Sequence, residues 1–478
     1  MARSSETAQA QHGATLDNVK RALAADDDER PVYVRIAVAL SNEIAAGGLK
    51  ASERLPSQRR LADALGVNLT TVTKSFKYLK DRGVVSAHVG RGTAVRGRGL
   101  DHIAPTYERL QALPRVDLSV LKQHSAAFDA AAAAALREIA AETASVADLC
   151  EYHPAAGPPA AREMAVRWLR DTRIEAAAED VAITAGAQHG LLLVLAAVMK
   201  PGDLVLVPAL TYQGVKTAAQ MLGLGLIPVA VDEGGILPDA LARHAGNPRV
   251  KAIYLTPTLD NPTSITLSLE RRRAIADVAA RHALVVVEDE VFRPLAREFL
   301  PSIRELYPQG TFHLSSVAKV MAPGLRCGFV VSPAAYAGAV LRALRGSMWM
   351  AAPLTVTLVA RLIAAGSHTA VIDELRERLL RRHDSAAAHL GRALRPGGPE
   401  GNCLWIDLPG ALPASEFTDF LRGEGIGVAP STMFSTGPSM HNGIRLYKGS
   451  VASDADWNEA VRTIAQCIER PPRAGERV

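Results

Sequence analysis

The sequence predicts an α/β protein of two parts: a small basic domain of three helices and a hairpin, then a large domain with a mainly parallel sheet. Three observations predict this fold class. The chain has 478 residues, too many for one ordinary hydrophobic core. Positive charge gathers near the N-terminus, where three short helical patterns follow one another. Beyond residue 157, short apolar runs alternate with amphipathic helices, which is typical of a parallel sheet covered on both faces.

The composition argues against membrane, metal-binding and secreted proteins. Hydrophobic residues make up 48% of the chain, yet the longest apolar run, Leu191–Met199, is far shorter than a membrane span. Residues 1–13 have no apolar core, so we expect no secretory signal. The 4 cysteines lie far apart, without a Cys-x-x-Cys motif or a His/Cys cluster. We therefore expect free thiols, a cytoplasmic protein and no metal site.

Charge is distributed unevenly along the chain. Residues 30–98 hold 13 Lys or Arg and 4 Asp or Glu, whereas the whole chain has a net charge of +5. The remainder is therefore mildly acidic. This asymmetry predicts one part that binds a polyanion and one part with another task.

The first 97 residues divide into an arm and a domain. Residues 1–29 are polar, and we expect a disordered arm with at most a short helix near Leu16 to Leu23. In residues 30–97, apolar positions at helical spacing over 33–44 predict a first helix. Ser57 is placed to cap a second helix, 58–65, and Asn68 a third, 69–82, with a glycine after each. A hairpin around residues 90–92 follows, so the pattern fits a winged helix-turn-helix.

Basic and hydroxyl side chains lie where such a domain meets DNA. The start of the third helix faces base edges and phosphates, the start of the second faces phosphate, and the wing tip approaches the minor groove. The expected contacts to double-stranded DNA are Arg54, Ser57, Arg59, Thr70, Thr71, Lys74, Gly90 and Arg91. The alternative is a small basic domain that binds another protein.

This segment closely resembles the GntR-type winged helix. The matching stretches are Pro31–Tyr33, Arg54–Ser57, Leu61–Ala62, Leu65–Val67, Thr71–Val72 and Gly90–Gly92. The chain departs from the family at Leu69, where an arginine is usual, so one expected DNA contact is missing.

The large domain follows a linker. Residues 98–117 contain two prolines and weak periodicity, and we expect the large domain over 118–478. Its expected strands are 181–184, 204–208, 226–231, 252–256, 284–288, 311–314 and 328–331. Ligands of such sheets gather at the carboxyl ends of the strands. The residues just after each strand are therefore the candidates for a binding site.

Chemically useful residues follow four of these strands. Gly186–Gly190 opens a helix whose free N–H groups suit a phosphate. Tyr212 offers a ring for stacking. Asn261, held extended before a proline, offers an amide. Asp289 ends a buried strand, where a carboxylate needs a cation as partner.

A lysine follows a fifth strand. Lys319 lies three residues after Ser316 and seven before Arg326. A lysine can form a Schiff base with an aldehyde cofactor, and the serine and arginine can hold an anionic group. Each motif alone has an ordinary explanation, such as a packed tyrosine or an Asx-Pro turn. Their order along the chain favours one shared pocket.

The order and spacing of these motifs resemble the fold-type I aminotransferases, from about Asp117 to Cys467. The resemblance implies a fold-type I aminotransferase-like domain with pyridoxal 5′-phosphate (PLP) as cofactor. It implies Lys319 as the Schiff-base lysine, Asp289 as partner of the pyridine nitrogen and Asn261 as donor to the ring 3′-oxygen. The other implied cofactor residues are Tyr212 on the ring, Ala187, Gln188, Ser316 and Arg326 on the phosphate, and Tyr152 reaching the phosphate from the neighbouring subunit. Arg445 is implied to clamp a carboxylate of the bound ligand.

Two departures from this family suggest a site kept for binding more than for turnover. Phe292 stands where aminotransferases often place a tyrosine that bonds the ring oxygen. Loss of that hydroxyl should raise the pKa of the Schiff base. Residues 117–122 also lack the Gly or Asn expected near the substrate.

A GntR-type winged helix joined to an aminotransferase-like body resembles the MocR regulators. The resemblance implies a cytoplasmic, nucleoid-associated bacterial transcription regulator that forms a head-to-tail, domain-swapped homodimer on paired half-sites. It would sense a small amino compound through aldimine exchange at Lys319 and alter DNA binding. Two alternatives stay open: an active PLP-dependent aminotransferase with an accessory DNA-binding module, and a regulator without PLP. The sequence does not decide whether weak transaminase turnover remains, which effector binds, or whether the target genes are activated or repressed.

Overall fold

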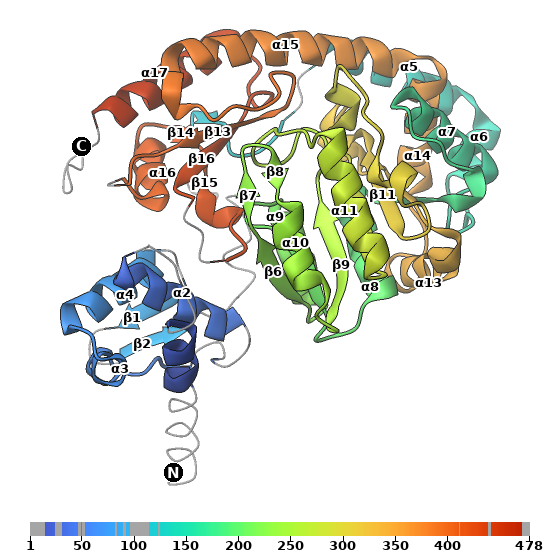
Figure 1. Cartoon of the computed structure of the whole chain (residues 1–478). Helices are drawn as coiled ribbons and strands as arrows, with labels where there is room; N and C mark the ends of the chain where they lie inside the picture. The colour runs from blue at the N-terminus through green and yellow to red at the C-terminus, as the bar shows by residue number, and fades with distance from the viewer. Residues whose placement is uncertain are drawn as a thin grey trace.

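The computed structural model describes residues 15–23, 31–45, 49, 53–81, 84–88, 92–95, 114–122, 125–410, 412–437 and 441–470. These residues form a small N-terminal unit, blue in Figure 1, and a larger body drawn from cyan to red. Gly90 and Arg91 at the expected wing tip, and most of the expected linker, lie outside the described residues.

The N-terminal unit has three helices followed by a hairpin. Its elements are α2 (Val32–Ala45), α3 (Gln58–Leu65), α4 (Leu69–Asp81), β1 (Val85–His88) and β2 (Gly92–Val95). Ser57 caps α3, its hydroxyl accepting from the Arg60 N–H at 3.3 Å. Gly66 ends that helix at φ 65°, a conformation that glycine adopts at little cost. The two strands pair antiparallel, so the predicted winged helix-turn-helix is confirmed.

A further helix, over residues 15–23, belongs to the same unit. Leu16 and Val19 are buried in its apolar core beside residues of α2 and α4. Asn18 donates to Glu43 at 2.9 Å, and the Arg35 guanidinium donates to the Leu23 carbonyl at 2.8 Å. The short helix expected near Leu16 to Leu23 is therefore present. The helix is held in place because its apolar side chains Leu16 and Val19 pack on that core.

The body is built on one seven-stranded sheet. Its order is β4 (Val181–Thr184), β12 (Gly328–Val331), β11 (Thr311–Ser316), β10 (Val285–Asp289), β9 (Val250–Leu255), β5 (Leu204–Pro208) and β6 (Gly225–Val229). β12 runs antiparallel to both of its neighbours, and the other pairings are parallel. The predicted mainly parallel sheet is therefore confirmed.

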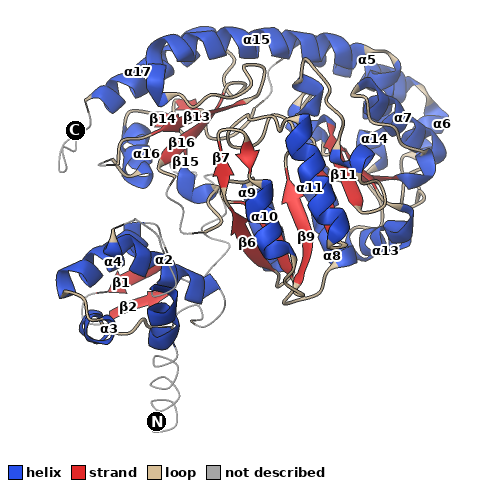
Figure 2. Ribbon diagram, in the orientation of Figure 1, coloured by secondary structure: helices blue, strands red, loops and turns tan. Residues whose placement is uncertain are grey.

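Alternate residues of the sheet pack against two different layers of helices. Val205, Tyr254 and Val287 pack with α8 (Ala187–Val198), α9 (Gln213–Met221) and α13 (Ala337–Ser347). Leu206, Ile253 and Val286 pack with α10 (Pro238–Ala245), α11 (Leu269–Arg281) and α12 (Ile303–Leu306). Strands buried on both faces read as continuous apolar runs, as these do. Figure 2 shows the resulting layers, with helices around a central sheet.

Segments from both ends of the body form a smaller layer. A three-stranded sheet has the order β13 (Cys403–Asp407), β16 (Gly443–Tyr447) and β15 (Ala429–Pro430), and β14 (Ile426–Gly427) pairs with β3 (Val116–Asp117). It packs against α15 (Ser367–Leu390), α16 (Ala414–Gly423) and α17 (Asp454–Glu469). The remaining helices are α5 (Ala126–Ala141), α6 (Thr143–Asp148), α7 (Pro159–Asp171) and α14 (Pro353–Ala364), and a short hairpin joins β7 (Val231–Asp232) to β8 (Gly235–Ile236).

Among the described residues, no single helix is both long and apolar enough to cross a membrane. Two helices pass such a test only as a pair, over 353–364 and 367–393, and they meet at a bend of 82°.

Candidate functional site

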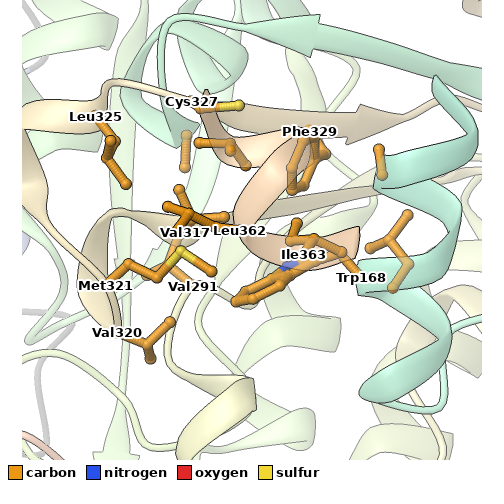
Figure 3. Close-up of a cluster of buried hydrophobic side chains, with 14 of the residues drawn as sticks. Trp168, Val291, Val317, Val320, Met321, Leu325, Cys327, Phe329, Leu362 and Ile363 are labelled. Atoms are coloured by element: carbon orange, nitrogen blue, oxygen red, sulfur yellow. The ribbon is translucent and has the colours of Figure 1, made fainter. Parts of the chain in front are cut away.

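Lys319 ends a short 3-10 turn, Val317–Lys319, between β11 and β12. The loop around it is anchored by apolar side chains: Val317, Val320, Met321 and Leu325 are buried in one cluster with Trp168 and Phe329 (Figure 3). Burial and the nearby Arg445 cation lower the pKa of Lys319 to about 8. A substantial share of these amines is therefore neutral, and nucleophilic, at mildly alkaline pH.

Asp289, the last residue of β10, offers one free carboxylate oxygen. The side chain is 4% exposed, and the Tyr254 hydroxyl donates to Oδ2 at 2.9 Å. Within the described part of the chain, Oδ1 is buried and has no hydrogen-bond partner. Burial raises the pKa of Asp289 to about 6. Such a group is costly unless a cation or donor meets it, and a protonated pyridine nitrogen has the required chemistry.

The turn between β4 and α8 is shaped for a phosphate. Ala187 and Gln188 open α8, and Gly186 before them lies at φ 88°. A Cβ on Gly186 would meet Arg326 Nη2 at 2.8 Å, so the guanidinium lies directly against this backbone. Arg326 Nη2 also donates to the Ala185 carbonyl at 3.1 Å. A helix N-terminus beside an arginine suits an anion.

Ser316 is occupied by backbone partners. Its hydroxyl donates to the Cys327 carbonyl at 2.8 Å and accepts from the Ala318 N–H at 3.1 Å. These bonds tie the lysine turn to the segment that carries Arg326. In this structure Ser316 therefore shapes the loop, while its expected contact to a phosphate stays a prediction.

Tyr212 lies at the start of α9, next to Gln188. The Gln188 side chain donates to the Gly214 carbonyl at 3.0 Å. A Cβ on Gly214 would lie 2.1 Å from Gln188 Oε1 and 2.2 Å from Tyr212 Cε1, so only glycine fits there. Burial, and then the negative charge of Asp289, raise the pKa of Tyr212 well above its usual value. The ring therefore stays neutral and lies close enough to Asp289 to feel its charge.

Asn261 is held in the same region by residues of the smaller layer. Its Nδ2 donates to the Tyr447 hydroxyl at 3.2 Å, and its Oδ1 accepts from the Cys403 thiol at 3.7 Å. The preceding Asp260 is bonded to the hydroxyls of Thr256 and Thr263, which fixes the loop. The amide of Asn261 is therefore oriented before any ligand binds.

Arg445 supplies an unpaired buried cation. Its side chain is 1% exposed, and Nη2 donates to the Ser119 carbonyl at 2.6 Å. Nε and Nη1 are buried without a hydrogen-bond partner among the described residues. The guanidinium carbon lies 3.6 Å from the centre of the Tyr447 ring and 4.9 Å from that of Phe434. A buried guanidinium with N–H groups that lack acceptors suits an anion such as a carboxylate.

Tyr152 is not part of this buried cluster. It is 81% exposed, and its ring packs edge-on against Trp349 at 5.9 Å, which is itself 53% exposed. Within one chain, the structure therefore does not bring Tyr152 to the other candidate residues.

The candidate DNA contacts lie on α3, α4 and the segment before α3. Arg54, Arg59, Thr70 and Lys74 are exposed, whereas Thr71 is half-buried. Asn68 Oδ1 accepts from both the N–H and the hydroxyl of Thr70 at 3.0 Å, which fixes the start of α4. Leu69, in the place of the usual arginine, is exposed at the same end of the helix.

Three aromatic residues near the site were not among the sequence candidates: Tyr254, Phe434 and Tyr447. Tyr254 lies in the buried run Ala252–Leu255, where its hydroxyl was the available signal because a buried phenol needs a partner. Tyr447 is two residues beyond Arg445 on β16, and alternation along the strand puts both on one face. Nothing in the sequence around Phe434 predicts its contact with the Arg445 guanidinium.

The chain matches two families of known proteins. Residues 117–464 match "Aminotransferase class I and II", and residues 32–95 match "Bacterial regulatory proteins, gntR family". The uncharacterized HTH-type transcriptional regulator YdeF of Bacillus subtilis is 29% identical over 87% of this chain and 89% of its own. The vitamin B6 salvage pathway transcriptional repressor PtsJ of Salmonella typhimurium is 29% identical over 90% and 97%. Among solved structures, the α-aminoadipate aminotransferase LysN of Thermus thermophilus, complexed with N-(5′-phosphopyridoxyl)-L-leucine, superposes with a TM-score of 0.68 at 26% identity, covering 78% of this chain and 97% of that one.

Proposed function

We propose that this chain senses an amino compound with an acidic group through PLP held at Lys319. The chain belongs to the class I and II aminotransferase family. It joins that domain to a gntR-family helix-turn-helix, and its relatives include HTH-type transcription regulators. Its domain boundaries would be those of the sequence, with the DNA reader over 30–97, a linker over 98–117 and the sensing body over 118–478. The aminotransferase fold is one that binds PLP. The regulatory use of that cofactor is the proposal.

The observation that carries the proposal is a set of unmet hydrogen-bonding groups around one amine. Asp289 Oδ1 and the Nε and Nη1 atoms of Arg445 are buried without partners in the part of the chain that is described. Each such group costs about 1–3 kcal/mol. Asp289 and Arg445 both shift the pKa of Lys319, so the three side chains lie close enough to interact electrostatically. A pyridine ring and a carboxylate are the partners that these groups lack.

The residues fit PLP in chemical type as well. Asp289 would bind the protonated pyridine nitrogen, Tyr212 would stack on the ring, and Asn261 would donate to the 3′-oxygen. Ala187 and Gln188 at the start of α8 would hold the phosphate, together with Ser316 and Arg326. When bound, the cofactor supplies an aldehyde that can form an imine with Lys319 or with the amino group of a ligand.

Arg445 would select the ligand. Its guanidinium lies against the Tyr447 and Phe434 rings and has buried N–H groups without acceptors among the described residues, so it could bind a carboxylate or a similar anion. A ligand would therefore need two groups: an amino group that reacts with the cofactor aldehyde, and an acidic group that binds Arg445. Amino acids have both.

A homodimer would complete the site. Tyr152 and Trp349 together form an exposed aromatic pair on the surface of the body. Exposed aromatic pairs of this size are more typical of interfaces than of free surface. Tyr152 of one subunit would reach the phosphate in the other, in a head-to-tail dimer. The DNA readers would then bind paired half-sites, because dimer geometry sets the spacing between them.

DNA would be contacted by the exposed residues of α3 and α4. Lys74 and Arg59 are exposed on these helices, and both can reach phosphates. The remaining expected contacts are Arg54, Ser57, Thr70, Thr71, Gly90 and Arg91. Ligand exchange in the body would alter DNA binding if it favoured one arrangement of the readers over another.

An active aminotransferase is the second candidate function. It is favoured by the similarity to LysN and by the lowered pKa of Lys319, which suits an acid–base role. Multiple-turnover transfer of amino groups to an α-keto acid would support it, whereas binding without turnover would support the regulator.

Trapping the cofactor tests its attachment directly. The protein would be incubated with PLP, reduced with borohydride and digested, and the modified peptide would be identified by mass spectrometry. We expect the phosphopyridoxyl group on Lys319, and none in Lys319→Ala. Modification of Lys448, a fully buried lysine whose pKa burial lowers to about 7, would contradict the assignment.

A further inference from the structure

The position that commonly supplies a hydroxyl to the ring 3′-oxygen in this family carries none here. Phe292 follows Asp289 by three residues and is 3% exposed. Its side chain is packed in the large apolar cluster of the body, with Val291 and Leu295. One expected donor to the ring oxygen is therefore missing, and Asn261 would act alone unless another group replaces it.

Tyr447 has a hydroxyl that contacts Asn261, the expected donor to the ring oxygen. It is the last residue of β16, is 5% exposed, and its oxygen accepts the hydrogen bond from Asn261 Nδ2 at 3.2 Å. Since the oxygen is the acceptor in that bond, the phenolic proton is directed elsewhere. Among the described residues, no acceptor for this proton is recorded. Tyr447 therefore holds an unused donor beside the amide that is expected to bind the ring oxygen.

The cross-strand neighbour of Tyr447 fixes the amide. Cys403 on β13 pairs with Tyr447 on β16, and its thiol donates to Asn261 Oδ1. The carbonyl end of Asn261 is thus bound by Cys403 and its amino end by Tyr447. One N–H of Asn261 and the O–H of Tyr447 remain for a common acceptor.

Arg445 fixes the ring of Tyr447 from one face. The guanidinium carbon lies 3.6 Å from the ring centre, and a cation over a phenol ring is favourable. Burial raises the pKa of Tyr447 to about 12, so the phenol keeps its proton at any ordinary pH and stays a donor. The ring therefore touches both the expected ligand clamp and Asn261.

We propose that Tyr447 is the second hydrogen-bond donor to the 3′-oxygen of the cofactor ring, with Asn261, and so takes the place of the hydroxyl missing at Phe292. This inference rests on the proposed binding of PLP. It makes Tyr447 a positioning residue of the sensor that touches the cofactor on one side and the carboxylate clamp on the other.

The test compares Tyr447→Phe with the unchanged protein, both loaded with PLP. Phenylalanine keeps the ring over which Arg445 stacks and removes only the oxygen. A donor to the ionised ring oxygen stabilises that form, so its loss should raise the pH midpoint of the bound chromophore by about one unit, comparable with one hydrogen bond. Asn261→Ala should move the midpoint in the same direction, and Tyr336→Phe, on the α13 side of the sheet, should leave it unchanged. An unchanged midpoint in Tyr447→Phe would overturn the inference.

A second measurement compares the affinities for PLP and for an analogue that lacks the ring oxygen. Tyr447→Phe should weaken the affinity for PLP about fivefold. The same substitution should have no effect on the affinity for 3-deoxypyridoxal 5′-phosphate, which lacks the ring oxygen. Equal losses for the two compounds would assign Tyr447 a merely structural role. Absence of any chromophore in the unchanged protein would instead sink the proposed function, so the two failures are distinguishable.

Discussion

Among single residues, charges that are buried before a ligand arrives define the pocket. Arg445 and Asp289 shift the pKa of Lys319 in opposite directions: the Arg445 cation lowers it and the Asp289 carboxylate raises it. Burial and Arg445 dominate, so the amine is a better nucleophile than an exposed lysine. The same unpaired groups give the pocket its preference for a cationic ring nitrogen and an anionic ligand.

The rate at which PLP attaches should follow the pKa of Lys319. Only the neutral amine attacks an aldehyde, so the rate should rise as the pH increases through about 8. In Arg445→Gln the cation that lowers this pKa is gone, and the rate profile should move to higher pH. Stopped-flow absorbance between pH 6.5 and 9.5 measures both profiles. The exposed Arg243→Gln on α10 is the control, and a profile that is identical in Arg445→Gln would contradict this electrostatic reading.

Asp289→Asn should weaken the binding of PLP. The amide keeps the shape but cannot pair with a protonated pyridine nitrogen, and a hydrogen bond to a charged group is worth about 1.5–3 kcal/mol. We expect the Kd for PLP to rise by a factor of about ten or more, as equilibrium dialysis would show. Because the pKa of Asp289 is raised to about 6, affinity in the unchanged protein should also fall as the pH drops through that value. A Kd that Asp289→Asn leaves unaltered would exclude the assigned partner.

At the scale of the element, the site depends on close backbone contacts between strands and turns. A Cβ on Gly328, the first residue of β12, would lie 2.6 Å from the Gly186 carbonyl carbon in the turn before α8. The proposed phosphate end of the pocket is therefore built by two backbones with no room for a side chain. At the other end of the molecule, Ser57 and Asn68 fix where α3 and α4 begin, and so where the basic side chains project.

Gly328→Ala should destabilise the body and weaken phosphate binding. The added methyl meets backbone that cannot rotate away, and overpacking of this kind costs about 1–3 kcal/mol. Urea denaturation and the affinity for PLP would both report the loss. Gly324→Ala, in the same loop, meets nothing within 4 Å and is the matched control. Equal stability of the two variants would show that the turn is not as rigid as described.

Lys74→Ala should weaken DNA binding for all sequences alike. A phosphate contact contributes about one counterion, so the slope of log affinity against log salt should become shallower by about 1. Fluorescence anisotropy over a range of salt concentrations measures it. The exposed Lys251→Ala on β9 changes the net charge equally and should have little effect. Loss of the PLP chromophore in Lys74→Ala would show that the division into two domains is wrong.

Much of this organisation could be predicted because the relevant signals are local. Strand patterns, capping residues and the order of Tyr212, Asn261, Asp289 and Lys319 can be read along the chain. What could not be predicted depends on contacts between distant segments. Tyr447 accepts a hydrogen bond from Asn261, which is 186 positions away in the chain. Ser316 donates to the Cys327 carbonyl, 11 positions further on, and nothing around Ser316 in the sequence indicates that partner. The packing of the helix over residues 15–23 could not be predicted for the same reason, since the core that it covers is supplied by α2 and α4.

In the whole molecule, a gntR-family helix-turn-helix is joined to an aminotransferase-like body, and the exposed pair of Tyr152 and Trp349 is the proposed link to a second chain. Trp349→Glu would place a charge in that interface and should shift the protein from dimer towards monomer. Sedimentation velocity measures the shift, with Arg243→Glu at another exposed position as control. A variant that sediments as the unchanged protein does would remove this surface from the dimer proposal.

The central claim is that a ligand exchanging at Lys319 controls DNA binding, and one titration tests it most directly. An amino acid is added to the PLP-loaded protein on operator DNA, while absorbance of the bound cofactor and DNA anisotropy are recorded in the same sample. The account predicts that both signals change with the same half-saturating concentration, and that both changes vanish in Lys319→Ala. A cofactor signal that responds while DNA binding does not, or DNA binding that responds equally in Lys319→Ala, would contradict it.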